Sequence, residues 1–499
     1  MSNKIIKYSL LFFFSFLFLT IIQLLYYGNR LDYFWNYNNS LQVSNGLIPY
    51  KDINIITTPL FHFITSLFLY VFGKNIIVYA SLMSIMKILH IVLISKIVSL
   101  LCFKNKIKKD TSINIFTYII GIILLYNLYY EYNLLAVFFI SLIIYLELLD
   151  QKDFKYNFLI GSIAALSFLT KQSIGLFAIM FVLVKPFIFK DNTKSMIYRL
   201  IGIVWPLIIF LLYLIITNSY DAFLSYCLFG LKEFNNAVSF IDSLRINHSG
   251  ISFSSIITVL LFIITFGTLI YQLYLLFKNK YDNNRKIILF YTIACFSCFY
   301  PIRDLHHLLP ALISLLPLIM YYLLKIRKSI VINKTFKYLF IIVGIEIALI
   351  PVNMYYSVYN GHSKNYTVLK NDYMSINGMV VESVLKDNID MIVKYEKDMK
   401  ESGINTIILN KSSVLFHLAQ GKYLKDYDLF MRGNFGEKGE ERLINEIKES
   451  KNSIYLIDVV DINDTDLNFN QLPNTIIDYV INNLNKKEDL LYFKVYEKE

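Results

Sequence analysis

Charged residues are scarce in this chain of 499 residues. Asp, Glu, Lys and Arg together make up 17% of it, compared with about 25% in an average soluble domain. Hydrophobic residues reach 56%, and the mean hydropathy is +0.51. This composition excludes an ordinary soluble domain and predicts a polytopic membrane protein.

Cysteine is also rare, and its positions exclude two kinds of stabilisation. None of the four cysteines lies in the long polar C-terminal segment, so that segment is not a disulfide-dependent scaffold. Cys295 and Cys298 form a CxxC within the apolar run Ile287–Tyr300, without a His or second Cys pair nearby. A zinc site needs such additional ligands. We therefore interpret both cysteines as packing residues.

Tryptophan occurs only twice, whereas the chain has 40 Phe and 39 Tyr. Aromatic rings suit lipid-facing helices and membrane interfaces. The net charge of +11 would also fit a nucleic-acid-binding protein, but Lys and Arg cluster in short loops between apolar runs rather than on one continuous face. We interpret the charge as a topology signal and expect no nucleic-acid partner.

Eleven apolar runs are interpreted as membrane-spanning helices. The first, about Ile6–Tyr27, is too long for a signal peptide and lacks a small-residue cleavage site, so we expect a retained helix with a cytoplasmic N-terminus. The other ten spans are expected near Ile76–Cys102, Ile113–Tyr126, Leu134–Leu149, Phe158–Thr170, Ile174–Phe189, Leu200–Ile216, Ile251–Phe277, Ile287–Tyr300, Leu308–Leu324 and Tyr338–Tyr356.

The basic residues support this topology, because alternate loops hold the Lys and Arg excess typical of the cytoplasmic side. The pattern requires that the run Pro59–Phe72 does not cross the membrane. It has about fourteen residues, begins with Pro and is followed by Gly73, which favours an interfacial or re-entrant helix. This helix would belong to a first external loop from about Gly28 to Lys74.

Residues 357–499 have ordinary polar patterning, and after an odd number of spans they would lie outside the cell. We expect helices at Val380–Ser402, Gly439–Glu449 and Thr475–Leu484, and strands at Ile404–Leu409, Ser453–Ile457 and Leu490–Tyr496. The glycine-rich stretch Gly433–Gly439 is interpreted as a plain turn rather than a phosphate loop. The predicted fold is therefore an all-α membrane domain over residues 1–356, followed by a small extracytoplasmic α/β domain.

Polar side chains gather in the loops assigned to the outer face. Asp32 and Asp52 lie in the first loop, Lys171 lies in a turn between two apolar helices, and a later turn reads Arg303-Asp304-Leu305-His306-His307. Lys171 could simply be solvated at the interface. Together with Arg303, it could instead neutralise a lipid-linked phosphate. The adjacent His306 and His307 lack metal-ligand spacing, so we favour phosphate binding or helix capping there.

These motifs resemble a known family. Asp32, the segment Ile48-Pro49-Tyr50-Lys51-Asp52, the pair Thr58-Pro59, Thr170-Lys171 and the Arg303–Pro310 turn are similar to loops of GT-C glycosyltransferases. That superfamily includes protein O-mannosyltransferases (glycosyltransferase family 39-like) and aminoarabinose lipid A transferases. Many relatives have an Asp-Glu pair where this chain has Asp32-Tyr33, so the resemblance leaves the metal requirement and the acceptor type open.

The resemblance implies an inverting transfer of a sugar from a polyprenyl-phosphate donor to a hydroxyl of a glycan, lipid or protein acceptor at the outer membrane face. Asp32 matches the catalytic carboxylate, and Asp52 is a second candidate that orients the loop or the acceptor. Lys171, Arg303, His306 and His307 would bind the lipid phosphate. No cofactor and no metal ligands are indicated.

Other classes of membrane protein share this topology. A transporter or lipid-linked glycan flippase would show repeats, broken helices and polar groups at the bilayer midplane, and none of these is evident in the sequence. A glycan polymerase or ligase of another fold, or a non-catalytic scaffold for envelope assembly, are further alternatives.

Overall fold

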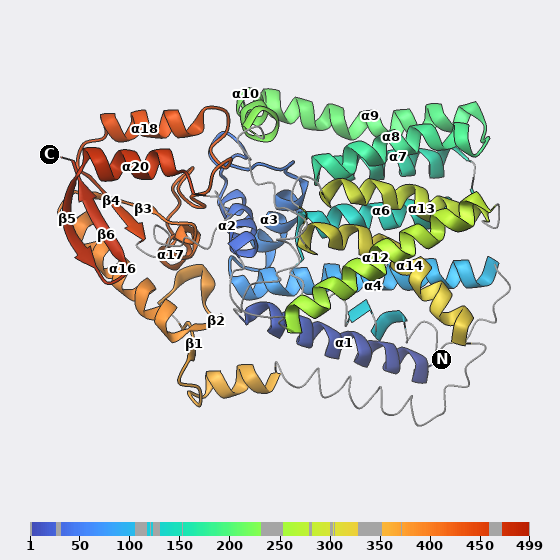
Figure 1. The fold of residues 1–499 in the computed structure, drawn as a ribbon, viewed down its shortest axis with the longest axis horizontal. Coiled ribbons are helices and arrows are strands. Elements are labelled where there is room, and N and C mark those ends of the chain that lie inside the picture. Colours follow the sequence, from blue (N-terminus) through green and yellow to red (C-terminus); the bar gives the residue numbers. More distant parts are fainter. Residues whose placement is uncertain are drawn as a thin grey trace. The chain divides into compact units, whose positions relative to one another are not determined.

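The computed structural model describes residues 2–25, 31–104, 117–119, 121–122, 130–151, 153–230, 253–278, 282–299, 303, 305–327, 352–370, 372–458 and 472–498. The chain forms two compact units, each assembled from segments that are distant in sequence (Figure 1). Unit 1 comprises Met1–Leu17, Met83–Leu212 and Ala237–Ala348; unit 2 comprises Phe18–Leu82, Tyr213–Asn236 and Leu349–Glu499. The segment predicted as the first external loop therefore shares unit 2 with the C-terminal domain.

The helices before residue 330 account for most of the predicted apolar runs. They are α1 (Ser2–Leu24), α2 (Leu31–Ser44), α3 (Leu60–Phe72), α4 (Ile76–Lys104), α6 (Tyr132–Leu149), α7 (Phe154–Phe168), α8 (Gln172–Ile188), α9 (Thr193–Ile216), α10 (Tyr220–Leu224), the π-helix η1 (Ser225–Phe229), α12 (Phe253–Phe277), α13 (Asn283–Phe296), the 3₁₀ turn η3 (Ser297–Phe299) and α14 (Leu305–Arg327).

Within the described ranges, five apolar helices are long enough to cross a membrane. They cover Ile76–Lys104, Tyr132–Leu149, Thr193–Ile216, Val259–Phe277 and His306–Leu324. The prediction of a membrane protein is supported at this level, whereas the number of eleven spans and the sides of the loops remain predictions. The expected spans Ile113–Tyr126 and Tyr338–Tyr356 lie largely outside the described residues.

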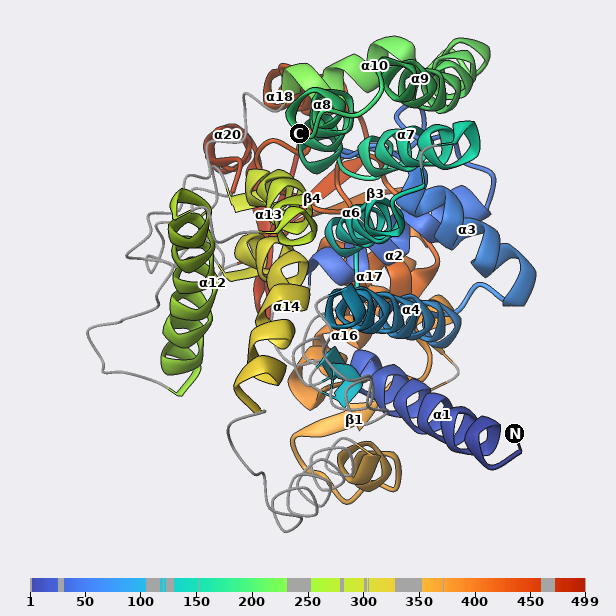
Figure 2. The same cartoon turned by 90° about the vertical axis from the view of Figure 1, so that its right-hand side faces the viewer.

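Glycines allow helices of unit 1 to approach closely. A Cβ atom on Gly161 of α7 would lie 2.1 Å from the backbone oxygen of Arg199 in α9, and one on Gly202 of α9 would lie 2.1 Å from that of Phe158. Small residues permit this backbone contact between apolar helices. Figure 2 looks along α6 and α8 of the same unit, which pack around α7 and against α13.

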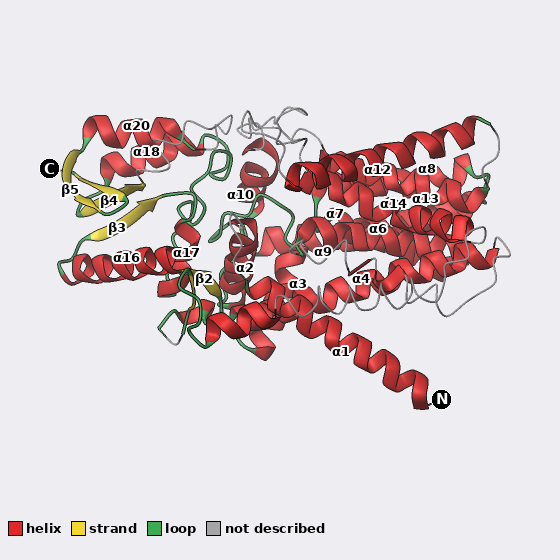
Figure 3. Cartoon of the chain, turned by 60° about the horizontal axis from the view of Figure 1, so that its bottom comes forward, coloured by secondary structure: helices red, strands yellow, loops and turns green. Residues whose placement is uncertain are grey.

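The C-terminal domain contains all the described β-strands, drawn yellow in Figure 3. Its elements are β1 (Tyr366–Val368), the 3₁₀ turn η4 (Met374–Ile376), β2 (Val380–Glu382), α16 (Ser383–Glu401), β3 (Asn405–Leu409), α17 (Ser413–Gln420), α18 (Gly439–Glu449), β4 (Ser453–Asp458), α20 (Asn474–Asn483), β5 (Asn485–Leu490) and β6 (Phe493–Glu497). The four-stranded sheet has the order β3-β4-β6-β5, with β3 and β4 parallel and the other neighbours antiparallel.

Helices cover both faces of this sheet (Figure 1). Leu443 of α18 and Val480 of α20 pack with Tyr455 and Ile457 of β4 on one face. On the other face, Phe416 of α17 contacts Phe493 of β6, with 5.9 Å between the ring centroids. The predicted α/β domain is therefore present.

Each predicted helix and strand of this domain has a counterpart in the structure, but the first helix begins later than predicted, and β1, η4, α17 and β5 were not predicted. Residues 380–382 form strand β2 paired with β1, not the first turn of a helix, because the β-branched Val380 and Val381 are buried in that pairing. Strand β5 was not predicted, because its charged sequence Asn485–Leu490 has no apolar alternation and forms an edge strand held by β6.

The first loop contains two helices rather than one. Helix α3 matches the predicted short helix; its 13 residues span about 20 Å, less than a hydrocarbon core of about 30 Å. Helix α2 was not predicted, because its sequence mixes Asn and Ser with apolar residues and does not separate them into a polar and an apolar face. Eleven of its fourteen residues are buried, so tertiary packing supports a sequence of modest helix propensity.

Candidate functional site

Asp32 lies in the first turn of α2 and is exposed, whereas the next ten residues of the helix are buried. A carboxylate at a helix N-terminus is stabilised by the unpaired N–H groups there. The backbone oxygen of Asp32 also accepts a hydrogen bond from the Asn36 side chain at 2.7 Å. Asp32 is thus an exposed acid at the end of a buried helix.

Polar contacts hold the rest of α2 in place. Ser40 Oγ lies 3.2 Å from Nδ1 of His62 in α3 and accepts a hydrogen bond from Thr65 Oγ1 at 2.6 Å. Tyr37 donates a hydrogen bond to the Ser375 backbone oxygen, 2.9 Å away in the C-terminal domain. Because buried polar groups are costly unless they are paired, these bonds favour one orientation of α2.

Asp52 is engaged within its own loop. Its Oδ2 accepts a hydrogen bond from the Ile48 N–H at 2.9 Å, and its N–H donates to the Ile48 backbone oxygen, also at 2.9 Å. Between them, Tyr50 has a positive φ of 69°, a conformation that non-glycine residues rarely adopt. These contacts support a loop-orienting role for Asp52, one of the two roles considered above.

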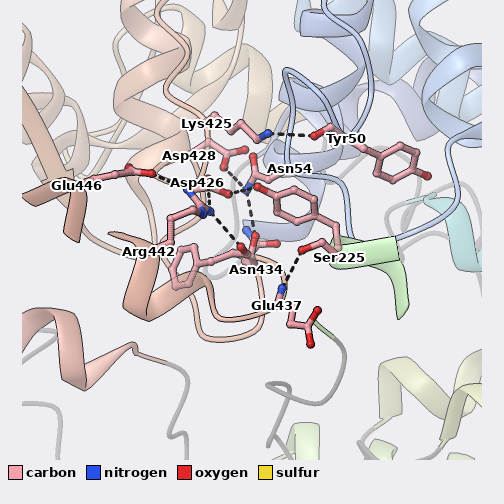
Figure 4. Close-up of polar contacts among 12 residues, drawn as sticks. Tyr50, Asn54, Ser225, Lys425, Asp426, Asp428, Asn434, Glu437, Arg442 and Glu446 are labelled. Atoms are coloured by element: carbon pink, nitrogen blue, oxygen red, sulfur yellow. Dashed lines mark hydrogen bonds and ion pairs between the residues drawn. The ribbon is translucent and has the colours of Figure 1, made fainter. Parts of the chain in front are cut away.

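The C-terminal domain contacts this loop through a second set of buried and partly buried polar residues (Figure 4). Asn54, which is fully buried, donates to Asp428 Oδ1 at 3.0 Å and accepts a hydrogen bond from Tyr423 at 2.8 Å. Asn38 of α2 donates to Asp428 Oδ2 at 3.4 Å. Lys425 donates to the backbone oxygens of Tyr50 and Lys51, at 3.0 and 2.8 Å. Asp428 therefore contacts both α2 and the loop.

A neighbouring acid in the same segment has an ionic partner. Asp426 pairs with Arg442 of α18 at 2.8 Å and accepts a hydrogen bond from Tyr226 of η1 at 2.8 Å. Burial raises the pKa of Asp426, and Arg442 opposes this shift. Asp426 thus links α18 and the π-helix to the segment that also carries Asp428.

The glycine-rich stretch forms turns that lead into α18, which begins at Gly439. Gly436 has a φ of +76°, and a Cβ atom there would lie 2.7 Å from Ser225 Oγ of the π-helix. The next residue, Glu437, donates its N–H to the same oxygen at 3.0 Å. The glycine is required for this close backbone approach.

In unit 1, Lys171 immediately precedes α8 and is partly buried. Its Nζ lies 4.9 Å from the ring centroid of Tyr132, a distance within cation–π range. Tyr132 and Glu131 begin α6, so the α7–α8 turn and the start of α6 lie at the same end of the bundle.

Arg303 and His306 are exposed, and His307 is partly buried near the start of α14. Asp304 lies outside the described residues. Adjacent helical residues point in different directions. Across the described ranges, no three His, Cys, Asp or Glu side chains converge as a metal site would require.

The predicted site residues are divided between the two units. Asp32 and Asp52 belong to unit 2, and Lys171, Arg303, His306 and His307 belong to unit 1. The association of the carboxylates with the cations in one site therefore remains a prediction.

Sequence reasoning missed a buried ionic network in unit 1. Glu147 of α6 lies 3.0 Å from Lys185 and 2.8 Å from Arg199, and it accepts a hydrogen bond from Tyr291 at 2.8 Å. Lys185 also pairs with Asp191. The network connects α6, α8, α9 and α13, and its two cations balance its two carboxylates. The polar residues inside apolar runs were its only sequence signal.

The residues that join the C-terminal domain to the first loop were also missed. Their signal is weak: in Asp426-Tyr427-Asp428-Leu429-Phe430, two acids alternate with apolar residues, which is unusual for a solvated loop. Asn54 has no distinguishing context in the sequence. The chain matches no protein family model, and no curated protein or solved structure is significantly similar to it.

Proposed function

We propose that this protein is an integral-membrane glycosyltransferase that moves a sugar from a polyprenyl-phosphate donor to an acceptor hydroxyl at the outer face of the membrane. The proposal extends the resemblance of the first loop to GT-C enzymes. Its substrates are the lipid-linked sugar and a glycan, lipid or protein acceptor.

The position of Asp32 is the observation that carries this proposal. It is an exposed carboxylate on a helix whose following residues are buried, so the acid is accessible and its support is ordered. A general base must reach the proton of the attacking hydroxyl and be held in place. Asp32 is assigned that role, and Asp52 orients the loop through its bonds to Ile48.

The donor phosphate is assigned to the cations of unit 1. The leaving group of the transfer is a polyprenyl phosphate, whose developing negative charge is stabilised by fixed cations. Lys171, which contacts the Tyr132 ring, and the exposed Arg303 serve this purpose, assisted by His306 or His307.

The test is a transfer assay on the purified full-length protein in detergent with a radiolabelled polyprenyl-phosphate sugar. Asp32→Asn should reduce sugar transfer or polyprenyl-phosphate release by about 100- to 10,000-fold, the usual contribution of a general base. Asp221→Asn is the matched control, because Asp221 is also an exposed acid in the first turn of a helix and should retain wild-type activity.

Equal activity of the wild type and Asp32→Asn would contradict the catalytic assignment. Absence of activity with every donor, combined with movement of a labelled lipid-linked glycan across vesicles containing the protein, would favour the flippase. The elution profile in size-exclusion chromatography shows whether each variant is folded.

A further inference from the structure

Asp428 is a buried carboxyl group that is not paired with a cation in the described part of the chain. It is fully buried, and both of its oxygens accept hydrogen bonds from neutral amides, those of Asn54 and Asn38. Among the described residues, no Lys, Arg or His forms an ion pair with it. A buried carboxylate of this kind is costly, because amide donors replace only part of its lost hydration.

Burial and the charge of Asp426 favour the neutral form of Asp428, whereas the hydrogen bonds from Asn54, Asn38 and the Leu429 backbone favour its ionised form. Asn38 of α2 and Asn54 of the first loop carry no charge, and Tyr423 and Tyr226 are the nearby phenols. The acid whose charge raises the pKa of Asp428 is Asp426, which forms an ion pair with Arg442 of α18. Burial raises the pKa of Asp428 to about 7, and the proximity of Asp426 adds to this shift while the hydrogen bond from Asn54 opposes it.

We propose that Asp428 is a proton-dependent latch, through which the C-terminal domain holds α2 and the first loop when the carboxyl is protonated and releases them when it is ionised. The protonated carboxyl keeps its carbonyl oxygen as an acceptor for Asn54, without a buried charge. Under the proposed function, on which this clause rests, the latch also positions α2 and therefore Asp32.

The direction of the pH effect follows from proton linkage. The folded-state pKa of about 7 lies above the ordinary value of about 4. Between these two values the latched state binds a proton that the released state does not. The latch is therefore strongest at about pH 4 and below, weakens as the pH rises from about 4 to about 7, and changes little above that.

The test is hydrogen–deuterium exchange of the full-length protein in detergent, corrected for the intrinsic pH dependence of exchange. We expect the protection of residues 50–54 and 423–434 to fall by roughly 10- to 100-fold between pH 5 and pH 8. In Asp428→Asn, which is neutral at every pH, this fall should disappear. The matched variant Asp426→Asn should lose protection overall, because it breaks the pair with Arg442, but should retain the fall with pH.

A flat wild-type profile, or the same fall in Asp428→Asn, would overturn the latch. If Asp428→Asn does not fold, Asn54→Ala provides a second test. This variant removes a hydrogen bond that lowers the pKa of Asp428. The pH at which the protection of residues 423–434 is half lost should therefore rise, and an unchanged value would contradict the proposal. Because exchange does not measure sugar transfer, this result is independent of the proposed catalytic activity.

Discussion

Two buried carboxylates show how differently the two units stabilise polar groups in their interiors. In unit 1, Glu147 is surrounded by Lys185 and Arg199 and by the Tyr291 hydroxyl. In unit 2, Asp428 accepts hydrogen bonds only from amides among the described residues, chiefly from Asn54. Glu147 is compensated by the charges of its partners, whereas Asp428 accepts hydrogen bonds from neutral amides.

The difference has a physical reason. Glu147 lies in a helix of membrane-spanning length, where an unpaired charge is expensive and water is scarce. Two cations close to one carboxylate offset this cost. Asp428 lies in a domain outside those helices, where protonation is an available alternative to pairing. Charge compensation therefore suits a permanent connection, and an uncompensated acid suits a reversible one.

Glu147→Ala should have the largest effect on stability. It leaves the side chains of Lys185 and Arg199, which are 8% and 3% exposed, without their shared carboxylate. Breaking one partner of a buried pair typically costs about 3–5 kcal/mol. Thermal unfolding in detergent measures this loss. Asp150→Asn, at an exposed position just after the same helix, is the control, and an equally small change in both variants would show that the network contributes little.

Arg442→Met should have an intermediate effect, because it leaves Asp426 buried without its ionic partner. We expect a loss of about 1–3 kcal/mol. The pKa of Asp426, already raised by burial, should rise further without Arg442. The folded state then takes up a proton as the pH falls, so the loss should shrink in acid.

Thermal unfolding at pH 5 and pH 8 measures this difference. Glu446→Gln is the control. It removes the exposed partner of Arg442 but leaves the ion pair between Arg442 and Asp426 in place. A defect of Arg442→Met that does not depend on pH would refute this account of Asp426.

Lys386→Ala should have the smallest effect. Lys386 and Asp390 form a partly exposed pair one turn apart on α16, with 2.6 Å between the charged atoms. Such helix pairs contribute about 0.3–0.5 kcal/mol, and salt screens them. Unfolding at low and high ionic strength, compared with Lys394→Ala on the same helix, tests this. If Lys386→Ala lost more stability than Arg442→Met, the ranking of these ion pairs by their burial would be wrong.

Much of the local structure follows from the sequence. The bounds of α4, α6, α12 and α14, and of β3, α18, β4 and α20, were predicted within a few residues, whereas α9 begins seven residues before the predicted span. These elements have strong periodicity or strong hydrophobicity, which depends only on neighbouring residues. Helix α2 and strand β5 were missed, because each is stabilised by segments distant in the chain: α3 and the C-terminal domain for α2, and β6 for β5.

The sequence by itself determined that the chain has membrane-length apolar helices and a small α/β domain, and it indicated Asp32, Asp52, Lys171 and Arg303 as candidate functional residues. Only the tertiary structure decided which polar residues are buried together: Glu147 with two cations, and Asp428 with two amides. The composition and periodicity of a segment indicate only its average environment in the folded protein. The protonation of one carboxyl depends instead on the few atoms within hydrogen-bonding distance, which folding brings from more than 370 positions away in the chain.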